Sequence, residues 1–214
     1  MALEDFLKRP RLRGRLHQVA FFVSIVACAI LIIKTQTQIG LIASIIYSIG
    51  VLSMFGISAL YHRVYWEPKP RAIMKRLDHS AIFILIAGSF TPVCLFALSE
   101  QDSRQLLILV WTIAILGVLK SVFWVSAPKP LSALLYVIMG WLGLPYIREF
   151  NKYLGTEKVM LILAGGILYT VGAVFYALRK PKLSPIIFSY HELFHAFTII
   201  AAALHYYVVY QICL

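Results

Sequence analysis

Two histidines near the end of the chain have the spacing that puts two nitrogen ligands on one face of a helix. His191 and His195 are four residues apart. A helix completes a turn about every 3.6 residues, so both imidazoles project from the same side. That geometry suits two ligands of one zinc ion, and a third ligand from another helix would leave the fourth position open for water. Open positions of this kind are typical of catalytic zinc sites.

A third ligand and an acid–base group are available elsewhere in the chain. His62 ends an apolar stretch, and Ser58 lies four residues earlier, on the same face of the expected helix. Asp78 begins the next apolar stretch. The serine could hydrogen-bond a bound water or a substrate carbonyl. The aspartate could act as general base toward a water whose pKa zinc lowers to about 7.

Each of these residues also has a plainer interpretation. Paired histidines can hydrogen-bond between membrane helices, Asp78 at the start of a helix can be an N-cap, and Ser58 can be a packing residue. Residues 191–195 also match the HExxH pattern of zinc peptidases, with Glu192 as base. Ser189 and Glu192 have the spacing of a capping box as well. Asp78 and Glu192 are therefore rival candidates for the base.

The remaining histidines are not expected at this site. His17 and His205 have no companions in sequence that compel a ligand role, and His79 is expected to face headgroups or a neighbouring loop. The three cysteines lie in or beside apolar runs without paired or metal-type spacing, so we expect them to be small packing residues. They are Cys28, Cys94 and Cys213.

The composition indicates that membrane helices position these side chains. Of the 214 residues, 61% are hydrophobic and only 14% are charged, and the mean hydropathy is +0.83. Apolar runs of about 20 residues, long enough to cross a hydrocarbon core, recur along the chain. We expect an all-α bundle of seven transmembrane helices, forming one domain over residues 1–214 with a short basic segment at 1–15. The expected spans are 16–33, 39–62, 77–98, 105–125, 132–147, 157–178 and 186–212.

Proline and glycine mark the expected boundaries. The basic stretch 63–76, which contains Pro68 and Pro70, is expected to be a loop, so Asp78 would open the third helix. The fifth span is short and is interrupted by Gly143 and Pro145.

The distribution of positive charge predicts the orientation of the helices. The formal charge is +11, but the lysines and arginines lie in short loops between apolar runs, which argues against a nucleic-acid partner. Segments rich in lysine and arginine alternate with segments poor in them, and the rich set carries about three times as many of these residues. This bias puts the N-terminus in the cytosol and the C-terminus outside. His62, Asp78, His191 and His195 then share one depth near the cytosolic face.

Four motifs resemble those of a known family. They are SALYH at 58–62, DHSAIF at 78–83, AGSFTP at 87–92 and HELFH at 191–195. In this combination they resemble the hemolysin III proteins of bacteria, which belong with the progestin and adiponectin receptor family and, more distantly, with alkaline ceramidases. The resemblance covers nearly the whole chain. One departure is the segment PRLRGRLH at 10–17, where many members carry a glutamate and asparagine motif.

The resemblance implies a zinc ion held by His62, His191 and His195, with Asp78 acting on the bound water and Ser58 beside it. It also implies a multi-pass protein of the bacterial inner membrane. In the receptor and ceramidase relatives the corresponding site is associated with hydrolysis of lipid amides such as ceramide. The leading expectation is thus a zinc-dependent hydrolase of a membrane lipid amide or ester.

Two other functions compete with this one. The family name suggests a cytolysin or pore-forming protein, although the spans look permanently embedded in the membrane. A receptor or sensor is the other alternative, in which zinc would only tie helices together. The polar residues stop near one leaflet, which disfavours a transporter. The sequence does not identify the substrate or the oligomeric state.

Overall fold

The computed structural model describes residues 10–184 and 186–214. Residues 1–9 of the expected basic segment, and Pro185, lie outside this range. Within it, seven helical spans are long and apolar enough to cross a membrane, which confirms the predicted all-α bundle. The helices are α2 (Arg15–Lys34), α3 (Gln38–Arg63), α4 (Pro68–Ala97), α5 (Glu100–Phe123), α6 (Lys129–Gly140), η1 (Leu144–Tyr146), α7 (Ile147–Leu154), α8 (Thr156–Leu178) and α9 (Tyr190–Cys213).

The outer surface of the bundle has the apolar character that lipid contact requires. Large side chains such as Phe123, Ile33 and Val19 are 83%, 80% and 64% exposed. A water-soluble bundle would bury such groups, since each one transferred from water contributes about 1.5–3 kcal/mol. The residues that are buried include many small and polar ones, as expected where membrane helices approach closely.

The predicted loop at 63–76 is wrong, because α4 already begins at Pro68. Glu67 occupies the N-cap position, and both prolines lie in the first turn, where a missing backbone N–H removes no helical hydrogen bond. Asp78 therefore lies about three turns inside the helix and is not its N-cap. The N-cap interpretation of this aspartate is excluded.

The fifth span is broken, as its glycine and proline predict, but it extends further than expected. Helix α6 ends at Gly140, a short 3₁₀ turn carries Pro145, and α7 then continues to Leu154. The last helix begins at Tyr190, four residues later than predicted, with Ser189 as its N-cap. Ser189 and Glu192 form the predicted capping box, which fixes the start of α9.

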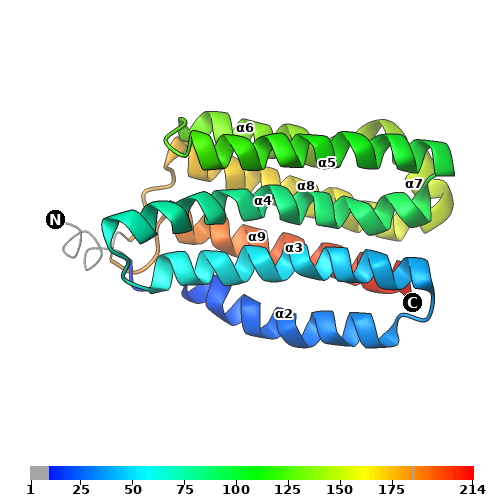
Figure 1. Cartoon of the computed structure of the whole chain (residues 1–214), viewed down its shortest axis with the longest axis horizontal. Helices are drawn as coiled ribbons and strands as arrows, with labels where there is room; N and C mark the ends of the chain where they lie inside the picture. Colours follow the sequence, from blue (N-terminus) through cyan, green and yellow to red (C-terminus); the bar gives the residue numbers. More distant parts are fainter. Residues whose placement is uncertain (1–9, 185) are drawn as a thin grey trace.

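One end of the bundle brings together the parts of the chain that carry the candidate site. Figure 1 shows α4 in the middle of the bundle, with α3 beside it, and the start of α9 at the same end as the start of α2. Helices α3 and α4 approach closely where Gly50 faces Gly88, and a Cβ on either glycine would lie only 3.2 or 3.1 Å from backbone atoms of the other helix. This crossing holds the end of α3 beside the first turns of α4, where His62 and Asp78 lie.

Candidate metal centre

Three imidazole rings converge at this end of the bundle. His62 comes from the last turn of α3, and His191 and His195 come from the first turns of α9. One nitrogen of each ring lies within 4.8 Å of the other two, and the Nε2 atoms of His62 and His191 are 3.2 Å apart. Nitrogen ligands about 2.0–2.1 Å from a tetrahedral zinc are roughly 3.3 Å from one another. The pair from His62 and His191 matches this separation, and no pair is wider than 4.8 Å.

The surroundings of the rings suit a bound cation. His62 and His195 are 7% and 2% exposed, and Nδ1 of His195 has no hydrogen-bond partner among the described residues. Buried polar atoms are normally paired, so an unpaired one next to two other imidazoles needs an explanation. The structure therefore brings together a donor set that fits a metal ion.

Asp78 and Ser58 lie beside this cluster, as their sequence positions predict. Oδ2 of Asp78 is 3.9 Å from Nε2 of His62. Oδ1 of Asp78 and Oγ of Ser58 are buried without a regular hydrogen-bond partner among the described residues. Both residues, with His191 and His195, border a small cavity of about 40 Å³. At roughly 10–15 Å³ for each water molecule, it has room for about three.

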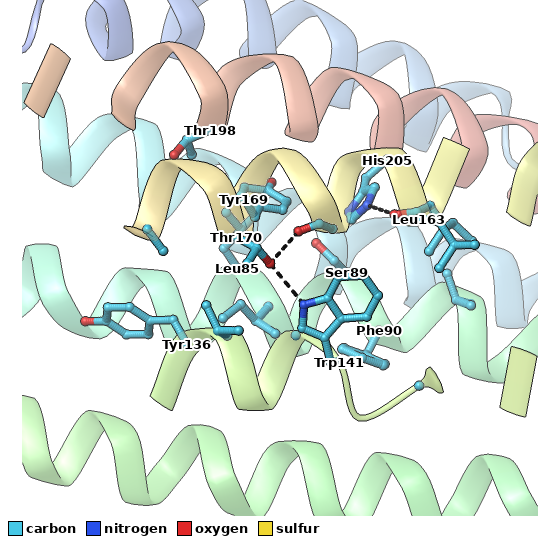
Figure 2. A pocket seen from close by; sticks show the side chains of 18 of the residues that line it. Leu85, Ser89, Phe90, Tyr136, Trp141, Leu163, Tyr169, Thr170, Thr198 and His205 are labelled. Atoms are coloured by element: carbon cyan, nitrogen blue, oxygen red, sulfur yellow. Dashed lines mark hydrogen bonds between the residues drawn. The ribbon is translucent and has the colours of Figure 1, made fainter. Parts of the chain in front are cut away.

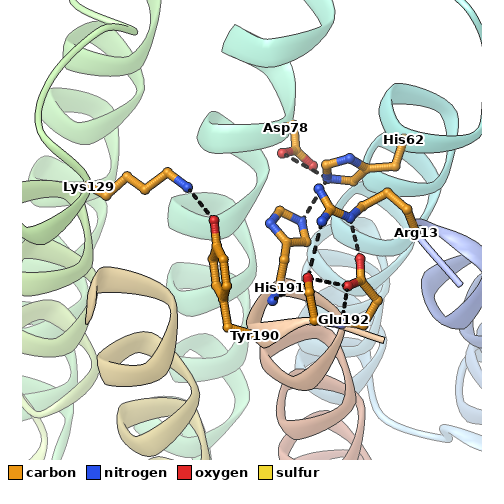
Figure 3. Close-up of polar contacts among 8 residues, drawn as sticks. Arg13, His62, Asp78, Lys129, Tyr190, His191 and Glu192 are labelled. Atoms are coloured by element: carbon orange, nitrogen blue, oxygen red, sulfur yellow. Dashed lines mark hydrogen bonds and ion pairs between the residues drawn. The ribbon is translucent and has the colours of Figure 1, made fainter. Parts of the chain in front are cut away.

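Glu192, the rival base, is engaged differently. It is fully buried, and its Oε1 accepts a hydrogen bond from Nε of Arg13 within an ion pair. Its Oε2 accepts one from the backbone N–H of Ser189 at 2.7 Å and another from the hydroxyl of Ser189. Figure 3 shows Glu192 held by Arg13, with Asp78 next to His62. Both oxygens of Glu192 thus have regular hydrogen-bond partners, whereas Oδ1 of Asp78 has none among the described residues, and Ser58 is its polar neighbour.

His17, which is not expected at the site from sequence, is a direct neighbour of it. Its ring stacks face to face on His195, with centroids 3.7 Å apart and planes 3° from parallel, and Phe55 packs against its edge. It is fully buried, and neither ring nitrogen has a hydrogen-bond partner among the described residues. A signal was available in the sequence. His17 begins the first span, which the charge pattern places at the same membrane face as His62.

A second, apolar cavity leads away from the histidines into the bundle. It has a volume of about 140 Å³ and is formed by α3, α4, α6, α7, α8 and α9. Its wall follows α9 from Phe194 to Val209, about 22 Å along the helix axis. Figure 2 shows Trp141 and Thr170 in this wall, where the indole N–H donates to the threonine hydroxyl at 3.0 Å. The two cavities share five lining residues: Met54, Ile82, Tyr136, Ala173 and Phe194.

The fold and the site together define a class: a seven-helix membrane protein with a three-histidine cluster at one end and an apolar cavity behind it. Residues 6–206 match the family model described as Haemolysin-III related. The chain belongs to this family, and the resemblance inferred from the motifs is confirmed.

Relatives extend along most of the chain. It is 33% identical to Hemolysin-3 of Bacillus cereus over 97% of this chain and 93% of the relative. It is 30% identical to the Hemolysin-3 homolog of Bacillus subtilis (strain 168), over 92% and 91% respectively. An Adiponectin receptor protein of Drosophila melanogaster is 29% identical over 81% of this chain and 43% of the relative. These relatives confirm the wider receptor superfamily.

Proposed function

We propose that the protein is a zinc-dependent hydrolase of a membrane lipid amide or ester. The observation that carries the proposal is the junction of the two cavities, where three histidines and the buried carboxylate of Asp78 meet an apolar space. Lipid chains suit that space, and the small cavity has room for a water molecule. The charge pattern supports a location in the bacterial inner membrane with the site near the cytosolic face.

The described side chains have distinct roles in this proposal. His62, His191 and His195 hold the zinc, which when bound polarises a carbonyl group and makes water a stronger nucleophile at neutral pH. Asp78 takes a proton from the attacking water and returns it to the leaving group. Ser58 donates a hydrogen bond to the substrate carbonyl from the same cavity wall.

The contacts of the two carboxylates favour Asp78 over Glu192 as the base. A base needs a free lone pair within reach of the water, and Oδ1 of Asp78, in the wall of the small cavity, has no regular hydrogen-bond partner among the described residues. The oxygens of Glu192 already accept hydrogen bonds from Arg13 and Ser189. We therefore assign Glu192 a structural role at the start of α9.

Elemental analysis combined with a turnover assay tests the proposal. We expect about one zinc per purified chain, lost in the His62→Ala, His191→Ala and His195→Ala variants. The Asp78→Asn variant should keep its zinc but hydrolyse acyl amide and ester lipids about 10²–10⁴-fold more slowly, because only the proton transfer is removed. For zinc content, His205→Ala is the control, since His205 is a buried histidine outside the cluster, with Nε2 3.1 Å from the carbonyl oxygen of Ile162. Stoichiometric zinc with no turnover above that of His191→Ala would refute the hydrolase.

The second candidate function is a receptor with a structural zinc. The origin of the ligands on two helices is the observation that supports it. The histidines come from α3 and α9, so a shared metal would tie two helices together. This alternative predicts that chelation lowers the melting temperature strongly and that no lipid is turned over. Cytolysis, suggested by the names of the Bacillus relatives, predicts leakage of dye from liposomes that disappears in His62→Ala.

A further inference from the structure

Three lysines from three helices gather at the rim of the small cavity. Lys75 comes from α4, Lys120 from α5 and Lys129 from the start of α6. Lys129 lines the cavity together with His79, and Lys120 contacts Ser132, another residue of its wall. His79 lies in the cavity wall, not toward headgroups or a loop as its sequence position predicts. We call these three residues the lysine rim.

Within the described part of the chain, the lysine rim has polar and aromatic contacts but no carboxylate partner. Nζ of Lys120 donates to Oγ of Ser132 at 2.5 Å. Nζ of Lys129 lies 3.3 Å from the hydroxyl of Tyr190, a contact visible in Figure 3. It also lies 4.5 Å from the ring centre of Tyr176. Among the described residues, the ion pairs at this end of the bundle are those of Arg13 and His62, and none involves the rim.

The lysine rim carries an excess of positive charge that a bound anion would neutralise. The described carboxylates nearby are Asp78, inside the small cavity, and Glu192, which is already paired with Arg13. All three lysines are half-buried, and the like charges of Lys75 and Lys120 act on each other. Lysine is a common point-charge ligand for phosphate, and basic pockets between membrane helices bind anionic headgroups.

The volumes of the two cavities determine where each part of a lipid fits. The small cavity, at about 40 Å³, has room for water and a scissile group but not for a headgroup as well. The apolar cavity, at about 140 Å³, takes a segment of an acyl chain. Since the cavities share lining residues, a lipid whose chain enters the apolar cavity presents its carbonyl at the histidines and its headgroup at the lysine rim.

We propose that the lysine rim binds the phosphate of a single-chain anionic phospholipid, which makes lysophospholipids of this kind the substrate class. This inference rests on the proposed function. In the reaction, the oxygen of water bonds to the acyl carbon and the ester C–O bond breaks. A proton of the water passes through Asp78 to the leaving alcohol oxygen. The products are a fatty acid and a glycerol phosphate, whose phosphate stays at the rim.

A competition experiment measures the headgroup preference without requiring turnover. The purified zinc-containing protein is mixed with equal amounts of oleoyl lysophosphatidic acid and mono-oleoylglycerol, which differ only by the phosphate, and bound lipid is counted by native mass spectrometry. We expect the phosphate-bearing lipid to be preferred at least tenfold. Lys129→Gln and Lys120→Gln should each lower the preference about fivefold. Lys152→Gln is the matched control, because Lys152 also lies over a tyrosine, Tyr153 at 5.2 Å, but on α7.

The outcomes separate this inference from the proposed function. Equal binding of the two lipids, or a preference that the rim variants leave unchanged, overturns the inference even if lipids are hydrolysed. Inorganic phosphate that competes as well as the lipid would show a site for a free anion and would also overturn it. A rim-dependent preference without hydrolysis would support the headgroup site while refuting the hydrolase.

Discussion

Unpaired nitrogen and oxygen atoms gather around the three histidines. His17, Ser58, Asp78 and His195 all contribute buried polar atoms without regular hydrogen-bond partners among the described residues. Leaving such an atom unsatisfied costs about 1–3 kcal/mol, so a site that exists only for stability would not collect several of them. At the scale of single residues, this end of the bundle is arranged for a ligand.

Stacking by His17 should contribute to metal affinity. The face-to-face contact fixes the plane of the His195 ring, and groups that orient a metal ligand are typically worth 10–100-fold in affinity. We expect His17→Ala to weaken zinc binding at least tenfold in competition with a chelator. His17→Phe should retain most of the affinity, because it keeps a flat ring on His195, and His205→Ala should have no effect. Equal affinities for His17→Ala and wild type would contradict this role.

At the scale of elements, the segment before α2 is fastened to the start of α9. The backbone N–H groups of Arg11 and Leu12 donate to the carbonyls of Ile186 and Ile187 at 2.8 and 3.2 Å. Gly14 has a positive φ of 76°, and a Cβ there would lie 2.7 Å from Cβ of His62. Only glycine therefore allows the segment to pass so close to the metal site.

The ion pair between Arg13 and Glu192 should stabilise this junction. Arg13 is 19% exposed and Glu192 is fully buried, so Glu192→Gln leaves a largely buried guanidinium without its partner. We expect the free energy of unfolding to fall by about 2–3 kcal/mol, while zinc content and turnover per folded molecule are retained. Thermal unfolding and zinc analysis measure both effects. The matched control is Asp102→Asn, which alters an exposed capping pair with Ser99. If Glu192→Gln loses turnover but keeps the wild-type melting temperature, Glu192 is the base instead.

At the scale of the whole molecule, the orientation of the bundle decides which compartment reaches the site. The lysine and arginine pattern predicts a cytosolic N-terminus. With that orientation, the α2–α3 connection lies outside the cell and the α3–α4 connection lies in the cytosol. Figure 1 shows the described N-terminal segment near the α3–α4 connection and the C-terminus at the opposite end.

Cysteine labelling in intact cells tests this orientation. We expect an impermeant maleimide to modify Gln36→Cys but not Glu67→Cys until the cells are opened. Both positions are exposed, and the native Cys28, Cys94 and Cys213 are buried, so the background should be low. The reverse pattern would move the site to the outer face of the membrane.

The sequence by itself determined the features that depend on local pattern. Apolar runs separated by charge predicted the seven spans, and the four-residue spacing put His191 and His195 on one helix face. The capping box at Ser189 was predicted as well. These properties depend on neighbours within about two turns of helix, which the sequence shows directly.

Only the tertiary structure decided which of these residues act together. Pro68 and Pro70 suggested a loop, and only the position of the first turn showed that Asp78 lies inside α4. The contact of His17 with His195 joins residues far apart in the chain, as does the pairing of Arg13 with Glu192. Such contacts follow from how whole helices pack against one another. Close approaches such as that of Gly50 to Gly88 fix this packing, and no local sequence pattern encodes them.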